Sequence, residues 1–315
     1  MHANTFYVLS RDPLVLMGGL RTLEQAASLP GRFTLIFHNG GLIRVPTLRR
    51  YIQARFRYRR DKRLIVVTNE PSEARWLRLL GLEALCLGHN MHVREHLYVP
   101  QPDVSKRYDA VYAAQLLPFK RLHLAEQVKS LYVLTYASGQ KSWDLRAYEP
   151  RLRHADFNPG WIPLENVPDI YAQARVGLAL SAQEGAMLAS LEYLFCGLPV
   201  VTTHNRGGRN RYLTPRNSRF VADDPSAVAA AVAEFVAAPP APLAIRAEAL
   251  QMVHRDRLAY VQMLADRCGV SFPSPESEVE RIWGGFEGIR KLAVPIGEIG
   301  QRINEGFSAG IVAGR

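Results

Sequence analysis

The stretch Val176–Thr203, VGLALSAQEGAMLASLEYLFCGLPVVTT, decides the fold that we expect. It opens with an apolar run at Val176–Leu180, passes through a polar loop into apolar residues at helical spacing, and ends in a second apolar run. Gly197 stands where a glycine commonly follows the last turn of a helix. Further on, Asp224 suits the N-cap and Pro225 the first turn of an alanine-rich helix. Strand, helix and strand in such close succession are typical of a parallel sheet covered by helices.

The same alternation continues in both directions along the chain. The strand candidates are Thr5–Leu9, Phe33–Phe37, Leu64–Thr68, Ala84–Leu87, Ala110–Ala114, Tyr132–Tyr136, Val176–Leu180 and Pro199–Thr202. Pro100-Gln101-Pro102 is the best linker candidate, with about four strands before it and at least four after it. We therefore expect an α/β protein with two Rossmann-like domains facing a cleft. The predicted parts are a short N-terminal domain over residues 1–100, a C-terminal domain over 101–270, and a helical tail over 271–315 that returns to the first domain.

The composition is that of an ordinary globular protein, with 48% apolar and 22% charged residues among 315. The three cysteines, Cys86, Cys196 and Cys268, are far apart in sequence, which argues against a disulfide framework and favours a reducing compartment. The sequence contains no apolar run of about 18 residues, and its start lacks the layout of a signal peptide. These observations predict a cytoplasmic protein, able to contact the inner face of a membrane.

The net charge of +10 is concentrated in one segment, because Arg44–Arg63 carries nine Lys or Arg and one acid. Tyr51, Phe56 and Tyr58 are interleaved with these cations. One interpretation is an amphipathic helix that lies on an anionic membrane surface. The other is an ordinary solvated basic helix. No glycine-aromatic RNA motif accompanies the cations, so nucleic acid is not an expected partner.

Two carboxylates mark a candidate site. Glu184 follows a predicted parallel strand, and open α/β sheets bind ligands at the carboxyl ends of their strands. Glu192 lies eight residues further on, 80° past two helical turns at about 100° per residue, so both carboxylates can face one cleft. The amides at the start of the helix, at 186–188, suit an anion. The alternative is a solvated loop acid followed by an exposed helical glutamate.

At this point the sequence resembles a known family. Glu184–Glu192, EGAMLASLE, followed by Cys196–Val201, CGLPVV, resembles the E-x7-E region of retaining GT-B glycosyltransferases, most closely glycosyltransferase family 4. Other segments that match the family appear in the same order: Asn158–Pro163 (NPGWIP), Val167–Ala174 (VPDIYAQA), Arg206–Arg209 (RGGR) and Asp224-Pro225. The resemblance covers residues 108–236 well and residues 1–100 weakly. It implies transfer of a sugar, with retention, from a nucleotide sugar to a glycan or lipid-linked acceptor, in the synthesis of cell-surface polysaccharide or glycolipid.

The resemblance also implies roles for individual residues. Glu184 would contact the donor sugar and Glu192 the ribose, with Lys120 holding the diphosphate. The loop that enters the helix would help to hold it, through Gly185, Ala186, Met187 and Leu188. Gln115 stands where the family usually has an arginine, and we expect Arg121 or Arg209 to compensate. We also expect a helix at Leu122–Lys129, with Lys120 and Arg121 at its start.

Two candidates precede residue 100. Gly18-Gly19 resembles the family's Gly-Gly turn, which lets the backbone approach the donor phosphate, although an ordinary turn explains the pair equally well. His38 follows a predicted strand and is a candidate for contact with the sugar or acceptor. With Glu184 and Lys120 it completes the catalytic set that we predict.

A metal site is not expected. His89, His92 and His96 invite a zinc interpretation, but the segment Leu87–Pro100 more closely resembles the family's entry into its interdomain linker. The sequence also lacks a D-x-D motif. No cofactor is therefore predicted beyond the nucleotide-sugar substrate.

Two alternatives to a transferase stay open. Gln115 and the short first domain favour a non-catalytic GT-B relative that binds a glycan or protein partner, and a GT-B nucleotide-sugar epimerase is the second alternative. The presence of Glu184, Glu192 and Lys120 favours an active transferase.

Overall fold

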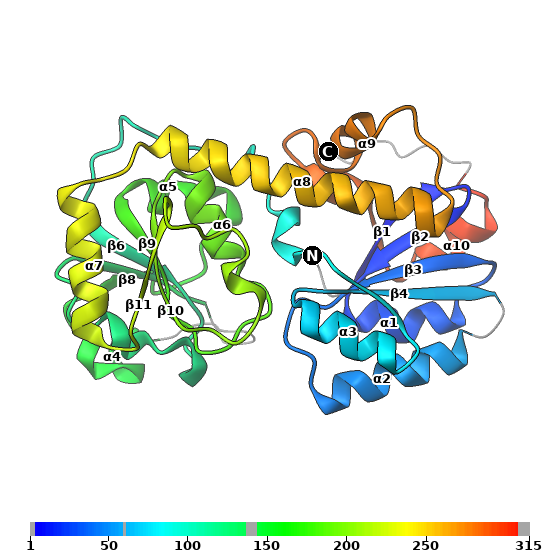
Figure 1. The fold of residues 1–315 in the computed structure, drawn as a ribbon, viewed down its shortest axis with the longest axis horizontal. Coiled ribbons are helices and arrows are strands. Elements are labelled where there is room, and N and C mark those ends of the chain that lie inside the picture. Colours follow the sequence, from blue (N-terminus) through cyan, green and yellow to red (C-terminus); the bar gives the residue numbers. More distant parts are fainter. Residues whose placement is uncertain (1–3, 59–60, 137–143, 308–315) are drawn as a thin grey trace. The chain divides into compact units, whose positions relative to one another are not determined.

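The computed structural model describes residues 4–58, 61–136 and 144–307. The chain forms two compact α/β units (Figure 1): unit 1 comprises residues up to Arg94 and from His254 onward, and unit 2 comprises Glu95–Val253. These boundaries differ from those expected at residues 100 and 270. The second division falls inside a single helix, α8 (Pro242–Cys268), where the sequence has no turn residue to mark it.

Unit 1 contains a six-stranded sheet in the order β12-β1-β2-β3-β4-β5. Its strands are β1 (Thr5–Arg11), β2 (Leu14–Gly18), β3 (Phe33–His38), β4 (Lys62–Thr68), β5 (Glu83–Cys86) and β12 (Ala293–Pro295). From β2 to β5 the strands are parallel, while β1 pairs antiparallel with both β2 and β12. The short strand β2 was not expected. It forms because the chain reverses directly after β1, so that Leu16 and Met17 are buried beside it.

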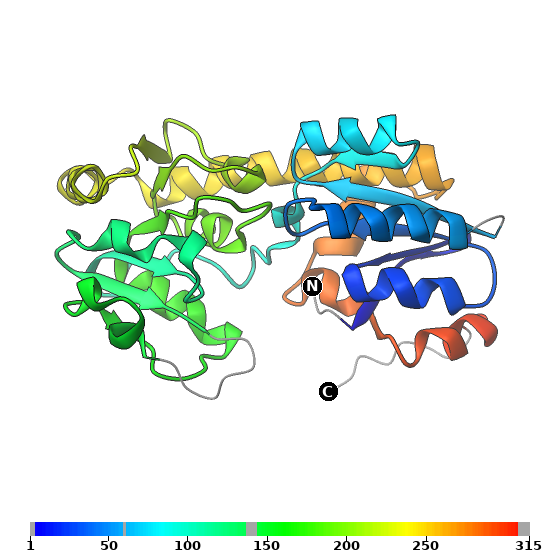
Figure 2. The ribbon, with the colours of Figure 1, turned by 90° about the horizontal axis from the view of Figure 1, so that it is seen from below.

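Helices cover both faces of this sheet. They are α1 (Leu20–Gln25), α2 (Val45–Arg57), α3 (Pro71–Leu79), α9 (Pro275–Trp283), α10 (Ile299–Asn304) and the C-terminal part of α8. Helices α1, α2 and α3 form a row along one face, seen in Figure 2, and α8 crosses the other. Phe37 and Tyr51 belong to the core under the row. On the α8 side, Tyr260 and Leu264 are fully buried, so α8 is a core helix of unit 1 over its last turns.

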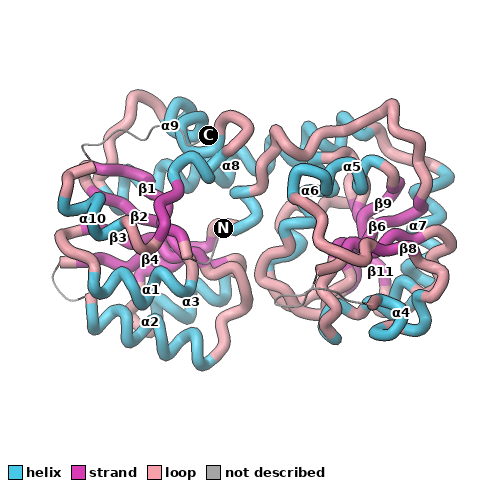
Figure 3. The backbone as a smooth tube through the Cα atoms, turned by 180° about the vertical axis from the view of Figure 1, so that it is seen from behind, coloured by secondary structure: helices cyan, strands magenta, loops and turns pink. Residues whose placement is uncertain are grey.

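Unit 2 contains a fully parallel six-stranded sheet in the order β11-β10-β9-β6-β7-β8. Its strands are β6 (Tyr108–Ala113), β7 (Leu131–Leu134), β8 (Asp156–Phe157), β9 (Ala174–Ala179), β10 (Val200–Thr203) and β11 (Ser218–Val221). Besides the N-terminal part of α8, its helices are α4 (Leu145–Tyr148), α5 (Val167–Ala172), α6 (Leu188–Phe195) and α7 (Pro225–Ala237). Figure 3 shows α5 and α6 on one side of these strands and α7 on the other.

The ends of α6 and α7 follow the sequence signals. Asp224 accepts a hydrogen bond from the Ala227 amide at the start of α7, as an N-cap aspartate should. After α6, Gly197 has φ +76°, the left-handed conformation that a helix C′ position requires. A side chain there would also meet Pro242, with its Cβ only 2.6 Å from the Pro242 Cβ. The sequence therefore predicts both helix ends.

No single described helix is long and apolar enough to cross a membrane. Helices α7 and α8, which are bent by 114° at their junction, satisfy length and composition together as a pair.

Candidate active site

A pocket of about 400 Å³ opens at the carboxyl ends of the unit 2 strands. Its wall includes Ala113 at the end of β6 and Leu134 at the end of β7. Six of the predicted site residues line it, namely Lys120, Glu184, Ala186, Met187, Leu188 and Glu192. The two predicted carboxylates therefore do face one cavity, and all of its lining residues belong to unit 2.

Glu184 is held from two sides. One carboxylate oxygen accepts a hydrogen bond from Lys120 Nζ at 2.5 Å, and the other accepts one from Ser181 Oγ at 2.6 Å. Its backbone is fixed as well, because the Glu184 amide donates to the Arg206 carbonyl at 3.0 Å. Lys120 is only 6% exposed, so this is a largely buried ion pair in the lining of the pocket. A charge-assisted bond in such a place is much stronger than one at the surface.

Glu192 is positioned by a tyrosine. It lies on α6, and its carboxylate accepts a hydrogen bond from Tyr171 Oη at 2.9 Å. Tyr171 lies on α5 and stacks on Tyr98, with the ring centroids 6.1 Å apart. Burial, and then the charge of Glu192, raise the pKa of Tyr171 well above its usual value, so its hydroxyl stays protonated and donates. The Tyr171 hydroxyl therefore holds the Glu192 carboxylate at the wall of the pocket.

The phosphate loop differs from the prediction. Lys120 ends a short 3-10 turn, η3 (Pro118–Lys120), and Arg121 adopts the left-handed conformation with φ 52°. A second short turn, η4 (Leu122–Ala125), replaces the expected helix at Leu122–Lys129. The expected helix is therefore wrong, and Lys120 and Arg121 do not stand at a helix N-terminus, since a single 3-10 turn carries little aligned dipole.

Arg121 and Arg209 are both used inside unit 2. The Arg121 guanidinium donates to the Leu180 carbonyl at 2.7 Å and pairs with Asp223 at 2.5 Å. Arg209 is fully buried and donates to Thr202 Oγ1 at 2.8 Å and to the Thr203 carbonyl at 2.6 Å. Burial lowers the pKa of Arg209 to about 10, which still leaves it charged at neutral pH. Neither arginine lines the pocket, so in this structure neither compensates for the missing family arginine.

Lys120 is consequently the one Lys or Arg among the described residues that line the pocket. Gln115 and Gly185 are not among the lining residues. The helix α6 begins at Leu188, with Met187 as its N-cap, so Ala186 lies in the loop and not in the first turn as expected.

The three earlier candidates, Gly18, Gly19 and His38, belong to unit 1. A Cβ on Gly18 would lie 2.0 Å from Thr22 Oγ1, so packing against α1 accounts for this glycine. A Cβ on Gly19 would meet nothing within 4 Å. His38 is the last residue of β3 and is buried, with Nε2 3.2 Å from Tyr260 Oη. It lies in the sheet and not in the loop where we expected it.

Residues 119–238 match the family model described as "Glycosyl transferases group 1". This range lies in unit 2 and contains the whole described pocket except Ala113. No curated protein in the comparison matches the chain.

Solved structures that resemble the chain extend over both units. Anabaena HepE in complex with UDP is 13% identical with a TM-score of 0.58, and the match covers 79% of this chain and 81% of that one. Sucrose-phosphate synthase from Thermosynechococcus elongatus is 17% identical with a TM-score of 0.56, covering 81% and 72% of the two chains. AviGT4, a glycosyltransferase involved in avilamycin A biosynthesis, is 15% identical with a TM-score of 0.54, covering 79% and 78%. The chain has the GT-B fold.

The expected architecture of two Rossmann-like domains is confirmed.

Several residues that shape the pocket were not singled out from the sequence: Ser181, which orients Glu184, Tyr171, which orients Glu192, and Asn158 and Trp161 in the wall. Three of these lie inside segments that matched the family, NPGWIP and VPDIYAQA. The resemblance of these two segments to the family was the sequence signal that could have pointed to Asn158, Trp161 and Tyr171. It did not indicate which side chains of the segments line the pocket.

Proposed function

We propose that the protein is a retaining, metal-independent glycosyltransferase that uses a nucleotide-sugar donor. The observation that carries this proposal is the joint presence of Lys120, Glu184 and Glu192 around one pocket of unit 2. Support also comes from the group 1 glycosyl transferase match over the same residues. Relatives of this fold include structures in complex with UDP and with UDP-glucose. A glycan or lipid-linked acceptor, in polysaccharide or glycolipid synthesis, belongs to the same proposal.

Each of the three residues has a distinct role in this proposal. Glu192 accepts hydrogen bonds from the ribose hydroxyls, and Tyr171 holds its carboxylate for that purpose. Lys120 neutralises the diphosphate, first in the donor and then as it departs. Glu184 contacts the sugar, where its negative charge stabilises the positive charge that grows at the anomeric carbon. The site offers positioning and electrostatic stabilisation, which suit a reaction without a covalent enzyme intermediate.

The Lys120–Glu184 ion pair implies that a diphosphate must compete with Glu184 for Lys120. A diphosphate that binds Lys120 must take over a cation that Glu184 holds at 2.5 Å. Because Ser181 also bonds Glu184, the carboxylate keeps one partner when Lys120 turns to the phosphate. The charge of the departing diphosphate would then be met by Lys120 and by backbone amides around Met187, which is why we propose that no metal is needed.

Three substitutions should separate the roles. We expect Lys120→Met to weaken UDP binding by about 1.5–3 kcal/mol, because one charged hydrogen bond is lost. Glu192→Gln should weaken binding of both UDP and uridine, whereas Lys120→Met should spare uridine. Glu184→Gln should retain UDP binding, because it frees Lys120, and should lower kcat with the true donor and acceptor. Isothermal titration and initial rates measure these effects.

The nucleotide itself is found by thermal-shift screening with UDP, GDP, ADP, TDP and CMP. A ligand at about 100 times its Kd stabilises the protein by roughly 2.7 kcal/mol. Arg219→Gln, at an exposed ion pair with Glu234 in the same unit, serves as the control and should change neither binding nor rate. Full turnover by Glu184→Gln would contradict the catalytic assignment. Failure of every nucleotide to bind would instead favour the non-catalytic relative, and hydrolysis or epimerisation without an acceptor would favour the epimerase.

We further propose that unit 1 contacts an anionic membrane surface through α2 and α3. These helices lie side by side, because Arg55 bonds the Leu80 carbonyl at 3.3 Å and Glu73 accepts from the Ile43 amide at 2.7 Å. The exposed arginines on the pair are Arg49, Arg50, Arg55, Arg57, Arg75 and Arg78. Large apolar side chains accompany them, with Phe56 71%, Trp76 67% and Leu79 71% exposed.

The structure corrects two expectations about the basic segment Arg44–Arg63. Tyr51 and Tyr58 are core residues, so of its three aromatic residues only Phe56 is exposed. Arg63 is paired with Glu83 at 2.8 Å and contributes little net attraction. Arg59 and Arg60 lie outside the described residues. The apolar contribution comes instead from α3, through Trp76 and Leu79.

Replacing Arg49, Arg55 and Arg57 together with Ser should weaken binding to vesicles rich in phosphatidylserine. Each cation near such a surface contributes about 1 kcal/mol, so the expected loss is about 3 kcal/mol at low salt and less at high salt. The charge-matched control replaces Arg153, Arg175 and Arg255, which are exposed elsewhere. Vesicle sedimentation measures both. Equal binding by the two triple variants would show that α2 forms no membrane surface.

A further inference from the structure

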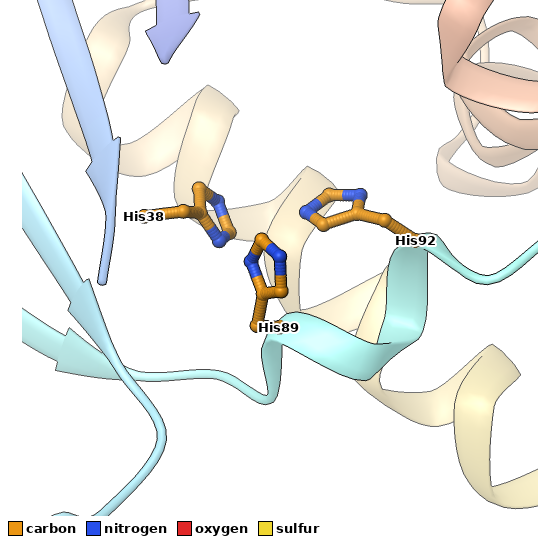
Figure 4. A group of neighbouring side chains, drawn as sticks. All are labelled: His38, His89 and His92. Carbon is orange, nitrogen blue, oxygen red and sulfur yellow. The ribbon is translucent and has the colours of Figure 1, made fainter. Parts of the chain in front are cut away.

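Three histidines that are distant in sequence meet inside unit 1. His38 comes from the end of β3, and His89 and His92 come from the short turn η2 (His89–His92), as Figure 4 shows. One ring nitrogen of each lies within 4.8 Å of one ring nitrogen of the other two. The remaining zinc candidate of the sequence, His96, is exposed and belongs to unit 2. The cluster has no part in the function proposed above and is independent of it.

The turn that carries two of these histidines is fixed to α8. Arg257 donates to the Met91 carbonyl at 3.0 Å and to the Val93 carbonyl at 3.1 Å, and its guanidinium lies 5.4 Å from the Trp283 ring centroid. The His89 amide donates to Asn69 Oδ1 at 2.8 Å. The spacing of the three rings is therefore imposed by the surrounding core.

Each ring has one buried nitrogen without a hydrogen-bond partner among the described residues, namely His38 Nδ1, His89 Nδ1 and His92 Nε2. Burial lowers the pKa of all three imidazoles, that of His89 to about 3. All three are thus neutral at pH 7. Three neutral imidazoles with converging nitrogens are the ligand set that zinc uses in many proteins.

The contact with Trp283 argues against a metal. Trp283 Nε1 lies 2.9 Å from His92 Nδ1, and an indole N–H can only donate. His92 Nδ1 must therefore carry the lone pair, and a neutral ring then has its proton on Nε2. A nitrogen that bears a proton cannot coordinate a cation. In metal sites the outer contact runs the other way, with the ligating histidine donating its second N–H.

The neighbours of His38 do not fix its tautomer in the same way. Tyr260 Oη lies 3.2 Å from His38 Nε2 and 3.3 Å from Met17 Sδ, and its one proton can be donated to either atom, so His38 carries its own proton on Nδ1 or on Nε2 accordingly. The cluster consequently presents one fixed N–H donor, from His92, beside nitrogens of His38 and His89 that can donate or accept. An oxygen that both donates and accepts matches this set, and a divalent cation does not.

The distances within the cluster leave room for one small ligand. One ring nitrogen of each histidine lies within 4.8 Å of one nitrogen of the other two, so an oxygen at the centre of this triangle is within about 2.8 Å of each ring, an ordinary N–H···O distance. We propose that the His38–His89–His92 cluster binds one buried water molecule, and that Trp283 excludes divalent metals by fixing the tautomer of His92. The water accepts from His92 Nε2, and toward His38 Nδ1 and His89 Nδ1 it donates or accepts according to the tautomer of each ring.

The first test measures the tautomers directly in the wild-type protein. Long-range ¹H–¹⁵N spectra at pH 7.5 should show His92 protonated at Nε2, with no change when Zn²⁺ is added. A proton on His92 Nδ1 would overturn the proposal, because that tautomer frees Nε2 for a metal.

The second test asks whether Trp283 is the cause. Trp283→Phe keeps the stacked aromatic ring but removes the N–H, so His92 can move its proton to Nδ1. We expect this variant to bind Co²⁺ about 10–100-fold more tightly than the wild type, the range in which second-layer contacts change metal affinity. The intense visible absorption of tetrahedral Co²⁺ reports binding, and adding His89→Gln to the variant should abolish it.

Two results would overturn the assignment. One is saturable binding of one Co²⁺ by the wild-type protein that His89→Gln removes. The other is a folded Trp283→Phe variant, checked by circular dichroism, whose Co²⁺ affinity equals that of the wild type. If the variant fails to fold, the tautomer measurement still decides the proposal.

Discussion

Replacing Arg209 with Leu is expected to destabilise unit 2 by about 3–5 kcal/mol. The guanidinium is 0% exposed and donates to the Ser181 and Thr203 carbonyls and to Thr202 Oγ1. Leucine fills part of the volume but leaves these buried acceptors without a donor, at a cost of about 1–3 kcal/mol each. Urea unfolding followed by hydrogen exchange of β9 and β10 measures the loss.

The matched control is Arg219→Leu, at an exposed arginine of the same unit that pairs with Glu234 at 3.0 Å. It should cost less than about 1 kcal/mol, as exposed ion pairs do. The comparison also distinguishes a structural role of Arg209 from a role as a phosphate ligand. A folded Arg209→Leu protein of unchanged stability that no longer binds UDP would make this residue a phosphate ligand, contrary to its contacts in the structure.

Lowering the pH from 7.5 to 5 is expected to destabilise unit 1 by several kcal/mol. Burial holds the pKa values of His38, His89 and His92 below the ordinary value of about 6.5. Below pH 6.5 the unfolded chain therefore binds protons that the folded unit does not, and stability falls as the pH falls. At pH 5 each histidine that stays neutral lowers the free energy of unfolding by about 2 kcal/mol, so three lower it by about 6 kcal/mol.

Urea unfolding at a series of pH values measures this effect, with Trp283 fluorescence reporting the cluster through its contact with His92. The positive charge of Arg257 also lowers the pKa of His92, in the same direction as burial. Replacing His92 with Gln removes one titrating group and should make the slope shallower by about 1.4 kcal/mol per pH unit. A stability of unit 1 that is constant between pH 5 and 7 would contradict the neutral cluster.

Patterns that are local along the chain were sufficient for much of the architecture. Alternating apolar runs predicted parallel sheets in two domains, and capping signals located the ends of α6 and α7 at Gly197 and Asp224. The spacing of Glu184 and Glu192 predicted that both would face one cavity, because a strand end and the following helix have nearly fixed geometry. These features depend on neighbours within about ten residues, and the sequence contains that information directly.

The tertiary structure decided which distant residues become partners. Antiparallel pairing of β12 with β1 assigns the C-terminal residues to unit 1, and α8 crosses the unit boundary without a break. Arg121 and Arg209 had the composition of phosphate ligands, but carbonyls and hydroxyls of unit 2 occupy their guanidinium groups and leave Lys120 as the described cation of the pocket. His38 joined His89 and His92, whereas His96 did not.

The physical reason is the same in each case. Propensity and spacing act over a few residues and determine what a segment forms, so the sequence by itself determined strands β6, β7, β9 and β10, helix α6 and the E-x7-E segment of unit 2. The choice of partner depends on burial, since a desolvated guanidinium or imidazole is stable only where acceptors or donors from remote segments reach it. Only the packed structure brings Trp283 to His92, and with it decides whether three histidines form a metal site or hold a water molecule.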